Sequence, residues 1–168
     1  IMDKNDGSRI EEGYNAMRMI LEKRMDLNKL FKDPEPIDGL IEASGGYPRD
    51  LVRMMKDLLL TAVMDKKEPP ISRADLQRMV GDVIDEQVKV YSKPIFDEDL
   101  PLLKAVAENK DVPRSERSQA FRLAELFDNH FVLGYRNGDE WYDLHPLVKR
   151  SAKVRKMLGQ ANGTDSKA

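Results

Sequence analysis

SGGYPRDLVRMMKDLLLTAV, residues 44–63, joins a Gly-Gly-Tyr-Pro turn to the strongest helical pattern in the chain. Apolar residues recur from Pro48 to about Met64 at the spacing of one helix face, at Leu51, Met55, Leu58, Leu59 and Ala62. Proline suits the first helical turn because its missing N–H would have no partner there. The stretch predicts an amphipathic helix with Arg49 in its first turn, where the helix dipole makes a cation mildly unfavourable.

Further helices are predicted on both sides of this segment. Three of them are expected over residues 8–23, 37–43 and 73–90. Ser8 is the expected N-cap of the first, and Glu11 completes a capping box. Ser72 is the expected N-cap of the third, whose apolar side includes Gln87. We therefore expect residues 1–93 to form one helical domain.

A smaller second domain is predicted over residues 94–150. Pro94 breaks the preceding helix, and the acidic residues after it begin a new one, since carboxylates are favoured at a helix N-terminus. Two helices are expected, over residues 98–108 and 115–128, with Ser115 capping the second. The inner face of that second helix is expected to consist of Ala120, Leu123, Ala124 and Phe127.

The helical spacing of apolar residues ends in HFVLGYRNGDEWYDLHP, residues 130–146. Two β-rich runs, residues 131–135 and 140–144, flank Asn137-Gly138, a dipeptide that strongly favours a tight hairpin turn. Trp141 is expected to pack inward against the helices. The fold is thus predicted to be mainly α, ending in a small winged-helix-like domain with one β-hairpin.

Composition excludes several classes of protein. The 168 residues include 40% hydrophobic and 35% charged residues and no cysteine, which rules out disulfides, thiol catalysis and thiolate metal sites. No apolar run approaches the roughly 18 to 20 residues that span a bilayer, and no signal-peptide pattern is present, so we expect no membrane contact and a cytoplasmic location. Because the chain starts at Ile1, we expect it to be a piece of a longer protein.

Charge is unevenly distributed over the second half of the chain. Residues 97–146 hold 6 Lys/Arg and 11 Asp/Glu, whereas the chain from Leu147 onward holds 6 basic residues and 1 acidic residue. LVKRSAKVRKML, residues 147–158, is predicted to be a basic helix that leads into a basic, partly disordered tail over residues 151–168. The segment Lys149–Lys156 is expected to dock on the acidic region through opposite charge.

The order of these features resembles the C-terminal part of AAA+-type and STAND-type P-loop ATPases, where a winged-helix domain often follows a helical lid. The resemblance rests on residues 44–63 and on ISRADLQRMV, residues 71–80. In this family a Gly-x-Pro-Arg turn opens a lid helix, and its arginine, called sensor 2, reaches the nucleotide phosphates. The matching residues are Gly46, Pro48 and Arg49. The resemblance implies a helical lid-type bundle that contributes one charge to nucleotide binding.

The resemblance also implies a missing catalytic core. The sequence contains no G-x-x-x-x-G-K-[ST] loop and no apolar strand that ends in paired acids for magnesium. We therefore expect neither ATP hydrolysis nor a cofactor in this piece alone. ATP and Mg²⁺ would bind to an N-terminal ATPase core in a longer parent chain, and this core is the first expected partner. A guanidinium suits the role because it is always charged and donates paired hydrogen bonds to phosphate.

A purely structural role for Arg49 is the alternative. The side chain would then pair with a nearby acid such as Asp50 or Asp57, and Gly45 and Gly46 would only end a helix. An exposed pair of this kind contributes about 0 to 1 kcal/mol to stability. Loss of Arg49 should barely affect folding under either interpretation.

The winged-helix-like region offers a possible nucleic-acid surface. Four arginines lie on its expected recognition helix and wing, namely Arg114, Arg117, Arg122 and Arg136. The acidic balance of this region disfavours DNA, because phosphate neutralisation supplies most non-specific affinity. Protein interaction, self-association or autoregulation is the favoured role. The alternatives for the whole chain are a self-contained winged-helix protein that binds nucleic acid and a plain adaptor.

Other polar residues are expected to be structural. His130 and His145 flank the hairpin without cysteines or His-x-x-x-His spacing, so packing or capping is favoured over metal binding. Asp97, Glu98 and Asp99 stand where a helix begins, a position that favours carboxylates without any catalytic role. No metal site is expected.

Overall fold

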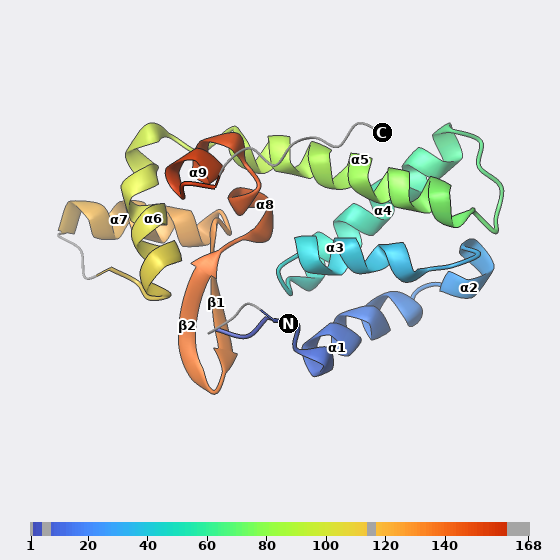
Figure 1. Ribbon diagram of the computed structural model, residues 1–168, viewed down its shortest axis with the longest axis horizontal. Coiled ribbons are helices and arrows are strands. Elements are labelled where there is room, and N and C mark those ends of the chain that lie inside the picture. Colours follow the sequence, from blue (N-terminus) through green and yellow to red (C-terminus); the bar gives the residue numbers. More distant parts are fainter. Residues whose placement is uncertain (1, 5–7, 114–116, 161–168) are drawn as a thin grey trace. The chain divides into compact units, whose positions relative to one another are not determined.

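The chain is mainly helical, with one two-stranded antiparallel sheet (Figure 1). The computed structural model describes residues 2–4, 8–113 and 117–160, without the side chains of residues 117, 118 and 137. Two compact units divide between Gln87 and Val88, within helix α5, whereas the sequence places a domain boundary at residue 93. Within the described ranges, no helix is long and apolar enough to cross a membrane.

The first unit consists of residues 1–87. Its elements are α1 (Glu11–Glu22), α2 (Leu27–Leu30), η1 (Glu35–Ile37), α3 (Asp38–Ala43), α4 (Pro48–Met64) and most of α5 (Arg73–Ser92). The predicted bounds of α4 are confirmed, and α3 and α5 lie close to their predicted ranges. Ser72 caps α5 as expected, because its Oγ accepts a hydrogen bond from the Asp75 N–H at 3.2 Å. The short elements α2 and η1 are additions that the sequence did not predict.

The core of the first unit forms where α1, α3 and α4 pack on one another. On α4 the fully buried side chains are Leu51, Met54, Met55 and Leu58. Removing apolar surface from water is the main stabilising contribution of such a core, worth about 1.5 to 3 kcal/mol for each large side chain. This packing fixes the rotation of α4 about its axis and so decides which of its residues face solvent.

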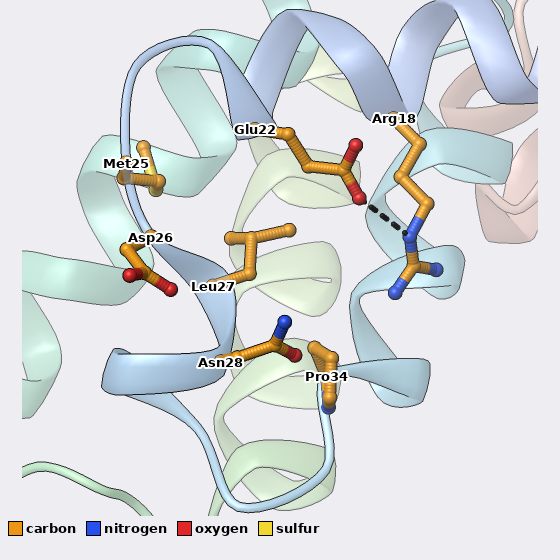
Figure 2. Close-up of a pocket in the computed structure, with 7 residues that line it drawn as sticks. All are labelled: Arg18, Glu22, Met25, Asp26, Leu27, Asn28 and Pro34. Atoms are coloured by element: carbon orange, nitrogen blue, oxygen red, sulfur yellow. Dashed lines mark ion pairs between the residues drawn. The ribbon is translucent and has the colours of Figure 1, made fainter.

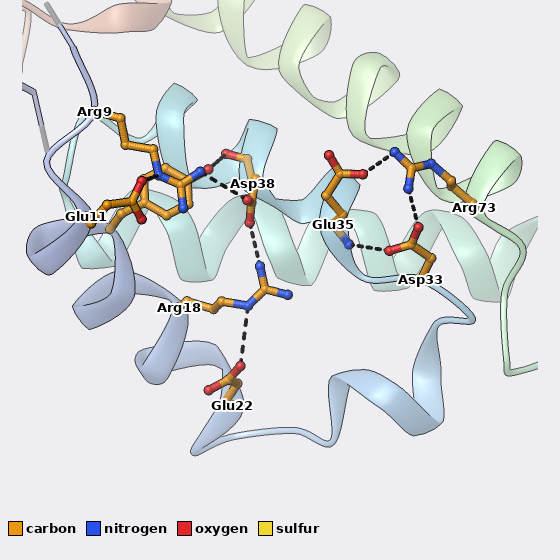
Figure 3. Close-up of polar contacts among 9 residues, drawn as sticks. Arg9, Glu11, Arg18, Glu22, Asp33, Glu35, Asp38 and Arg73 are labelled. Carbon is orange, nitrogen blue, oxygen red and sulfur yellow. Dashed lines mark hydrogen bonds and ion pairs between the residues drawn. The ribbon is translucent and has the colours of Figure 1, made fainter.

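Polar contacts reinforce the first unit at two places (Figure 3). Asp38 of α3 accepts hydrogen bonds from Arg18 at 2.7 Å and from Arg9 at 3.4 Å, which ties α1 and the segment before it to α3. Arg73 of α5 pairs with both Asp33 and Glu35. These contacts join segments that are distant in sequence.

The predicted start of the first helix is wrong. α1 begins at Glu11, and its N-cap is Ile10, which has an extended backbone and no capping side chain. Ser8 lies outside the helix because its carbonyl accepts a hydrogen bond from the Asp3 N–H at 2.9 Å within a short bridge between Met2 and Arg9. The extended pairing holds residues 8–10 away from helical geometry.

The second unit consists of residues 88–168. Its elements after α5 are η2 (Asp97–Asp99), α6 (Leu100–Asn109), α7 (Arg117–Asp128), β1 (Val132–Asn137), β2 (Asp139–Leu144), α8 (Pro146–Lys149) and α9 (Ala152–Met157). β1 and β2 form the predicted hairpin, with Val132 opposite Leu144 and Asn137 opposite Asp139. α6 packs on β2 and α7 packs on β1. Trp141 is 2% exposed, which confirms its predicted place in the core.

Two predictions in the second unit require correction. The inner face of α7 carries Leu123 and Leu126, whereas Ala120 and Ala124 are exposed. The predicted basic helix over residues 147–158 is split into α8 and α9, because buried Ser151 is extended and its Oγ caps α9. The expected cap Ser115 and the tail from residue 161 lie outside the described residues.

The basic C-terminal segment contacts acidic residues of the second unit, as predicted. Lys149 Nζ lies 2.6 Å from an Asp143 carboxylate oxygen, and Lys153 Nζ lies 2.8 Å from an Asp97 carboxylate oxygen. His145 also has the expected capping role, since its Nδ1 accepts a hydrogen bond from the Leu147 N–H at 3.2 Å.

Candidate functional site

The turn before α4 has a well-defined backbone. Gly45 and Gly46 adopt φ values of 60° and 88°, a left-handed conformation that glycine reaches without steric cost. The Ser44 hydroxyl donates to the Ile41 carbonyl at 2.7 Å and accepts from the Gly46 N–H at 3.3 Å. Pro48 then occupies the first turn of α4. The three residues of the Gly-x-Pro-Arg pattern therefore lie in a hydrogen-bonded turn and in the first turn of α4.

Arg49 projects from this turn into solvent. Its side chain is exposed and forms no hydrogen bond or ion pair with any residue that the structure describes. The neighbouring carboxylate of Asp50 is buried and pairs with Arg53 at 3.1 Å, while Asp57 accepts a hydrogen bond from Gln87 at 3.1 Å. Neither of the two acids considered as structural partners for Arg49 therefore pairs with it.

One face of α4 runs from cationic to apolar along the helix. Arg49, Arg53 and Lys56 follow one another at spacings of four and three residues, so they share the exposed face. The same face continues with three exposed apolar side chains, Leu60 (50% exposed), Val63 (75%) and Met64 (81%). The two carboxylates of α4 are buried or half-buried. The outer face of α4 therefore presents positive charge next to Arg49.

The four arginines proposed for nucleic-acid contact fall in different situations. Arg114 lies outside the described residues, and the side chain of Arg117 is not described. Arg122 donates two hydrogen bonds to Asp99, at 2.6 and 2.9 Å, and one to Glu125 at 2.5 Å. Arg136 is exposed on β1 and has no partner within the described part of the chain. Of the two arginines whose side chains the structure describes, Arg122 is therefore committed to internal ion pairs and Arg136 is not.

Arg122 has an internal role that conflicts with phosphate binding. Its partner Asp99 is fully buried, so the ion pair neutralises a carboxylate inside the unit. Hydrogen bonds from Arg122 to Asp99, and then to Glu125, raise the pKa of the guanidinium above its ordinary range. The acid cluster at residues 97–99 is structural, as expected, because Asp99 also accepts a hydrogen bond from the Phe96 N–H at 2.8 Å.

Two hollows lie on the surface of the described residues. A polar one of about 510 Å³ in the first unit is shown in Figure 2 and is lined by Arg18, Glu22, Met25, Asp26, Leu27, Asn28 and Pro34. A more apolar one of about 450 Å³ in the second unit is lined by Glu98, Pro101, Leu102, Ala105, Pro113, Gln119 and Arg122. The arginine of each hollow is already paired with two carboxylates. Neither hollow therefore offers an uncommitted cation for a phosphate.

A buried charge cluster in the second unit was missed by the sequence analysis. Asp143 is 3% exposed, and one of its carboxylate oxygens lies 2.6 Å from both Lys110 Nζ and Lys149 Nζ. Burial lowers the pKa of Lys149 below its ordinary value of 10.5. The alternation of a β-strand places Asp143 on the same face as inward-pointing Trp141, and this signal could have identified it as a buried carboxylate that needs cations.

Metal binding finds no support in the described residues, among which no group of three or more His, Asp or Glu side chains could hold an ion. Comparisons with protein-family models, with curated proteins and with solved structures find no match. Arg49, in the first turn of α4, is one of the exposed arginines that pair with no described residue.

Proposed function

We propose that this chain is the helical lid and winged-helix-like region of an AAA+/STAND-type P-loop ATPase, with Arg49 as its sensor 2 arginine. The observation that carries the proposal is the state of Arg49, which lies directly after the Gly46-Tyr47-Pro48 turn, exposed and without a partner in the described part of the chain. A permanently charged fork of N–H donors in this state is suited to bind phosphate oxygens from outside the unit.

The surroundings of Arg49 support an anionic ligand. The N-terminal end of a 17-residue helix carries partial positive charge, and exposed Arg53 and Lys56 continue on the same face of α4. The acid nearest in sequence, Asp50, is buried, so it does not present a competing exposed carboxylate. The phosphates of a nucleoside triphosphate held by an adjacent ATPase core would be attracted to this positively charged face of α4.

The second unit would serve protein interaction or regulation in the same parent protein. Its order of two helices followed by an antiparallel hairpin supports a winged-helix-like architecture. Its recognition helix α7 uses Arg122 internally, and residues 97–146 carry an excess of acids, both of which disfavour phosphate-backbone binding. DNA binding is therefore not part of the proposal.

The test uses the natural full-length protein that contains this sequence. Arg49→Ala should lower the ATPase kcat/KM by about tenfold or more, because it removes at least one charge-assisted hydrogen bond to phosphate. Arg49→Lys should retain part of the activity. Arg136→Ala, which removes another exposed and unpaired arginine, is the matched control and should change kcat/KM less than twofold.

Two results would contradict the proposal. One is a full-length gene that encodes no G-x-x-x-x-G-K-[ST] loop, because the nucleotide would then have no binding core. The other is an Arg49→Ala variant with unchanged ATPase activity and nucleotide affinity. The melting temperature should be the same for the wild type and both alanine variants, which separates loss of nucleotide contact from loss of folding.

A further inference from the structure

The outer face of α4 continues beyond Arg49 as a row of exposed side chains that the proposed nucleotide contact does not use. Arg53, Lys56, Leu60 and Val63 follow one another at spacings of three, four and three residues, and Met64 lies one turn beyond Leu60. We call these five residues the α4 strip. Alternating spacings of three and four residues place side chains along one line of a helix, which is the geometry of the contact row between two packed helices.

The C-terminal half of the α4 strip is apolar. Leu60, Val63 and Met64 are 50%, 75% and 81% exposed, and they account for three of the seven large apolar side chains that the described residues leave exposed. The helix already buries a separate apolar face, which includes Leu51 and Leu58, against α1 and α3. Exposed apolar side chains that cluster in this way mark a docking surface, whereas scattered ones are ordinary.

The N-terminal half of the α4 strip is cationic. Lys56 is exposed and forms no hydrogen bond or ion pair with any described residue. Arg53 lies 3.1 Å from the buried carboxylate of Asp50, and its side chain is still 43% exposed. The next acid along α4, Asp57, accepts a hydrogen bond from Gln87, whose buried Oε1 has no partner among the described residues. Because the strip contains no acid of its own, an occupant of this half has to bring carboxylates.

The order of charge and apolar surface along the α4 strip distinguishes between possible occupants. A nucleic acid would pair with the cations and leave the apolar half exposed. A helix that lies on a membrane has apolar residues along its whole length with cations beside them, whereas on α4 the two kinds follow one another. A two-fold contact along the strip would place Arg53 against Val63 of a second copy and Lys56 against Leu60. Two cations would then be buried without carboxylates, which is unfavourable.

We propose that the α4 strip binds an acidic amphipathic helix of a protein partner. Aspartate or glutamate side chains of that helix pair with Arg53 and Lys56, and its apolar side chains cover the other three residues of the strip. Two helices packed side by side lie about 8 to 10 Å apart, a distance that these side chains span. The inference does not rest on the assignment of Arg49 to a nucleotide, because Arg49 is not part of the strip.

Two designed helical peptides of about 18 residues, a length that spans the strip, test the proposal on the chain of residues 1–168. Each has glutamates on one half and leucines on the other half of a single face, in opposite orders for parallel and antiparallel packing. Fluorescence anisotropy measures their binding. One of the two should bind saturably, and the same peptide with lysine in place of each glutamate should bind at least about tenfold more weakly.

Variants of the strip show whether the peptide binds there. Changing Leu60→Ser and Val63→Ser together should weaken binding about tenfold or more, because both apolar contacts are lost. Lys56→Glu should weaken it by a similar factor and should improve binding of the lysine peptide. Met19→Ser is the matched control, since Met19 is a 51% exposed apolar residue of α1 in the same unit, and it should change binding less than about twofold. Arg49→Ala should change it less than about threefold, so this result and the ATPase measurement above fail independently.

Several outcomes would overturn the proposal. One is that neither glutamate peptide binds, and another is that Met19→Ser weakens binding as much as the double serine variant does. Without peptide binding, a dimer in sedimentation that the double variant loses would assign the strip to a second copy. Binding to vesicles of phosphatidylserine and phosphatidylcholine that the double variant loses would assign it to a membrane surface. Circular-dichroism melts check folding, and Val63→Ser alone replaces the double variant if that variant does not fold.

Discussion

Arg49 and Arg122 both lie in the first half of a helix, yet the fold uses them in opposite ways. The guanidinium of Arg122 donates hydrogen bonds to Asp99, which is fully buried, and to Glu125. The guanidinium of Arg49 donates no hydrogen bond to any described residue, although the next residue, Asp50, has a buried carboxylate. The two side chains are chemically identical, so their different use has another cause. The buried carboxylate of Asp99 requires the charge of Arg122, whereas no buried carboxylate requires the charge of Arg49.

The comparison separates residues that hold the fold from residues that the fold leaves available. A buried carboxylate without a cation costs several kcal/mol, so the arginine that neutralises it is fixed by stability. An exposed arginine without a partner contributes almost nothing to stability. The stability of the described chain therefore gives no reason for an arginine at position 49, which agrees with the proposed contact to an external phosphate.

Removal of Arg122 should have the largest effect. Arg122→Ala leaves Asp99 buried without its cation, and we expect the free energy of unfolding to fall by about 3 kcal/mol. Urea denaturation followed by circular dichroism measures the change. Arg136→Ala is the matched control, because Arg136 is exposed and unpaired in the same unit, and should change stability by less than about 0.5 kcal/mol. Equal effects would show that Asp99 does not depend on Arg122.

Lys149, like Arg122, pairs with a buried carboxylate, but the two respond differently to pH. The ammonium of Lys149 can lose its proton and its charge, whereas the guanidinium of Arg122 stays charged. Burial lowers its pKa in the folded chain below 10.5. Between this lowered pKa and 10.5 the unfolded chain binds more protons, so the contribution of Lys149 to stability should rise with pH across that window. Lys149→Met should abolish this rise, whereas Lys156→Met, which changes an exposed lysine, should preserve it.

Urea denaturation at several pH values up to 10.5 measures the difference between wild type and each variant. The expected change is smaller than that caused by Arg122→Ala, because Lys110 also binds Asp143 and continues to neutralise it. A wild-type stability that falls relative to Lys149→Met over this window would contradict the assigned direction of the pKa.

Local signals predicted the elements that local chemistry controls. Pro48 and the apolar period gave the correct bounds of α4, and Asn137-Gly138 gave the hairpin. The failure of Ser8 to cap α1 and the internal pairing of Arg122 with Asp99 could not be predicted, since each depends on a contact that local sequence patterns do not show. Asp99 lies 23 residues before Arg122, and only the folded chain brings them together.

The candidate sites show the same limit. The Gly-x-Pro-Arg pattern located Arg49, but its lack of a partner is a property of the packed structure. Gln87 was correctly expected on the buried side of its helix, yet its unpaired oxygen depends on how α4 and α5 face each other. A sequence pattern can indicate where such residues lie. Only the folded structure shows which of their polar atoms lack a hydrogen-bond partner.

Arg49→Ala should have the smallest effect on stability, within about 0.5 kcal/mol of the wild type. The side chain is exposed, pairs with no described residue, and lies where the helix dipole slightly disfavours a cation, so its removal costs the fold nothing. Urea denaturation of the chain without nucleotide measures this directly. A loss above about 1 kcal/mol would show that Arg49 has a structural partner and would remove the reason to assign it to an external phosphate. If Arg49→Ala leaves stability unchanged but lowers the ATPase activity and nucleotide affinity of the full-length protein, Arg49 serves an external phosphate while Arg122 serves the fold.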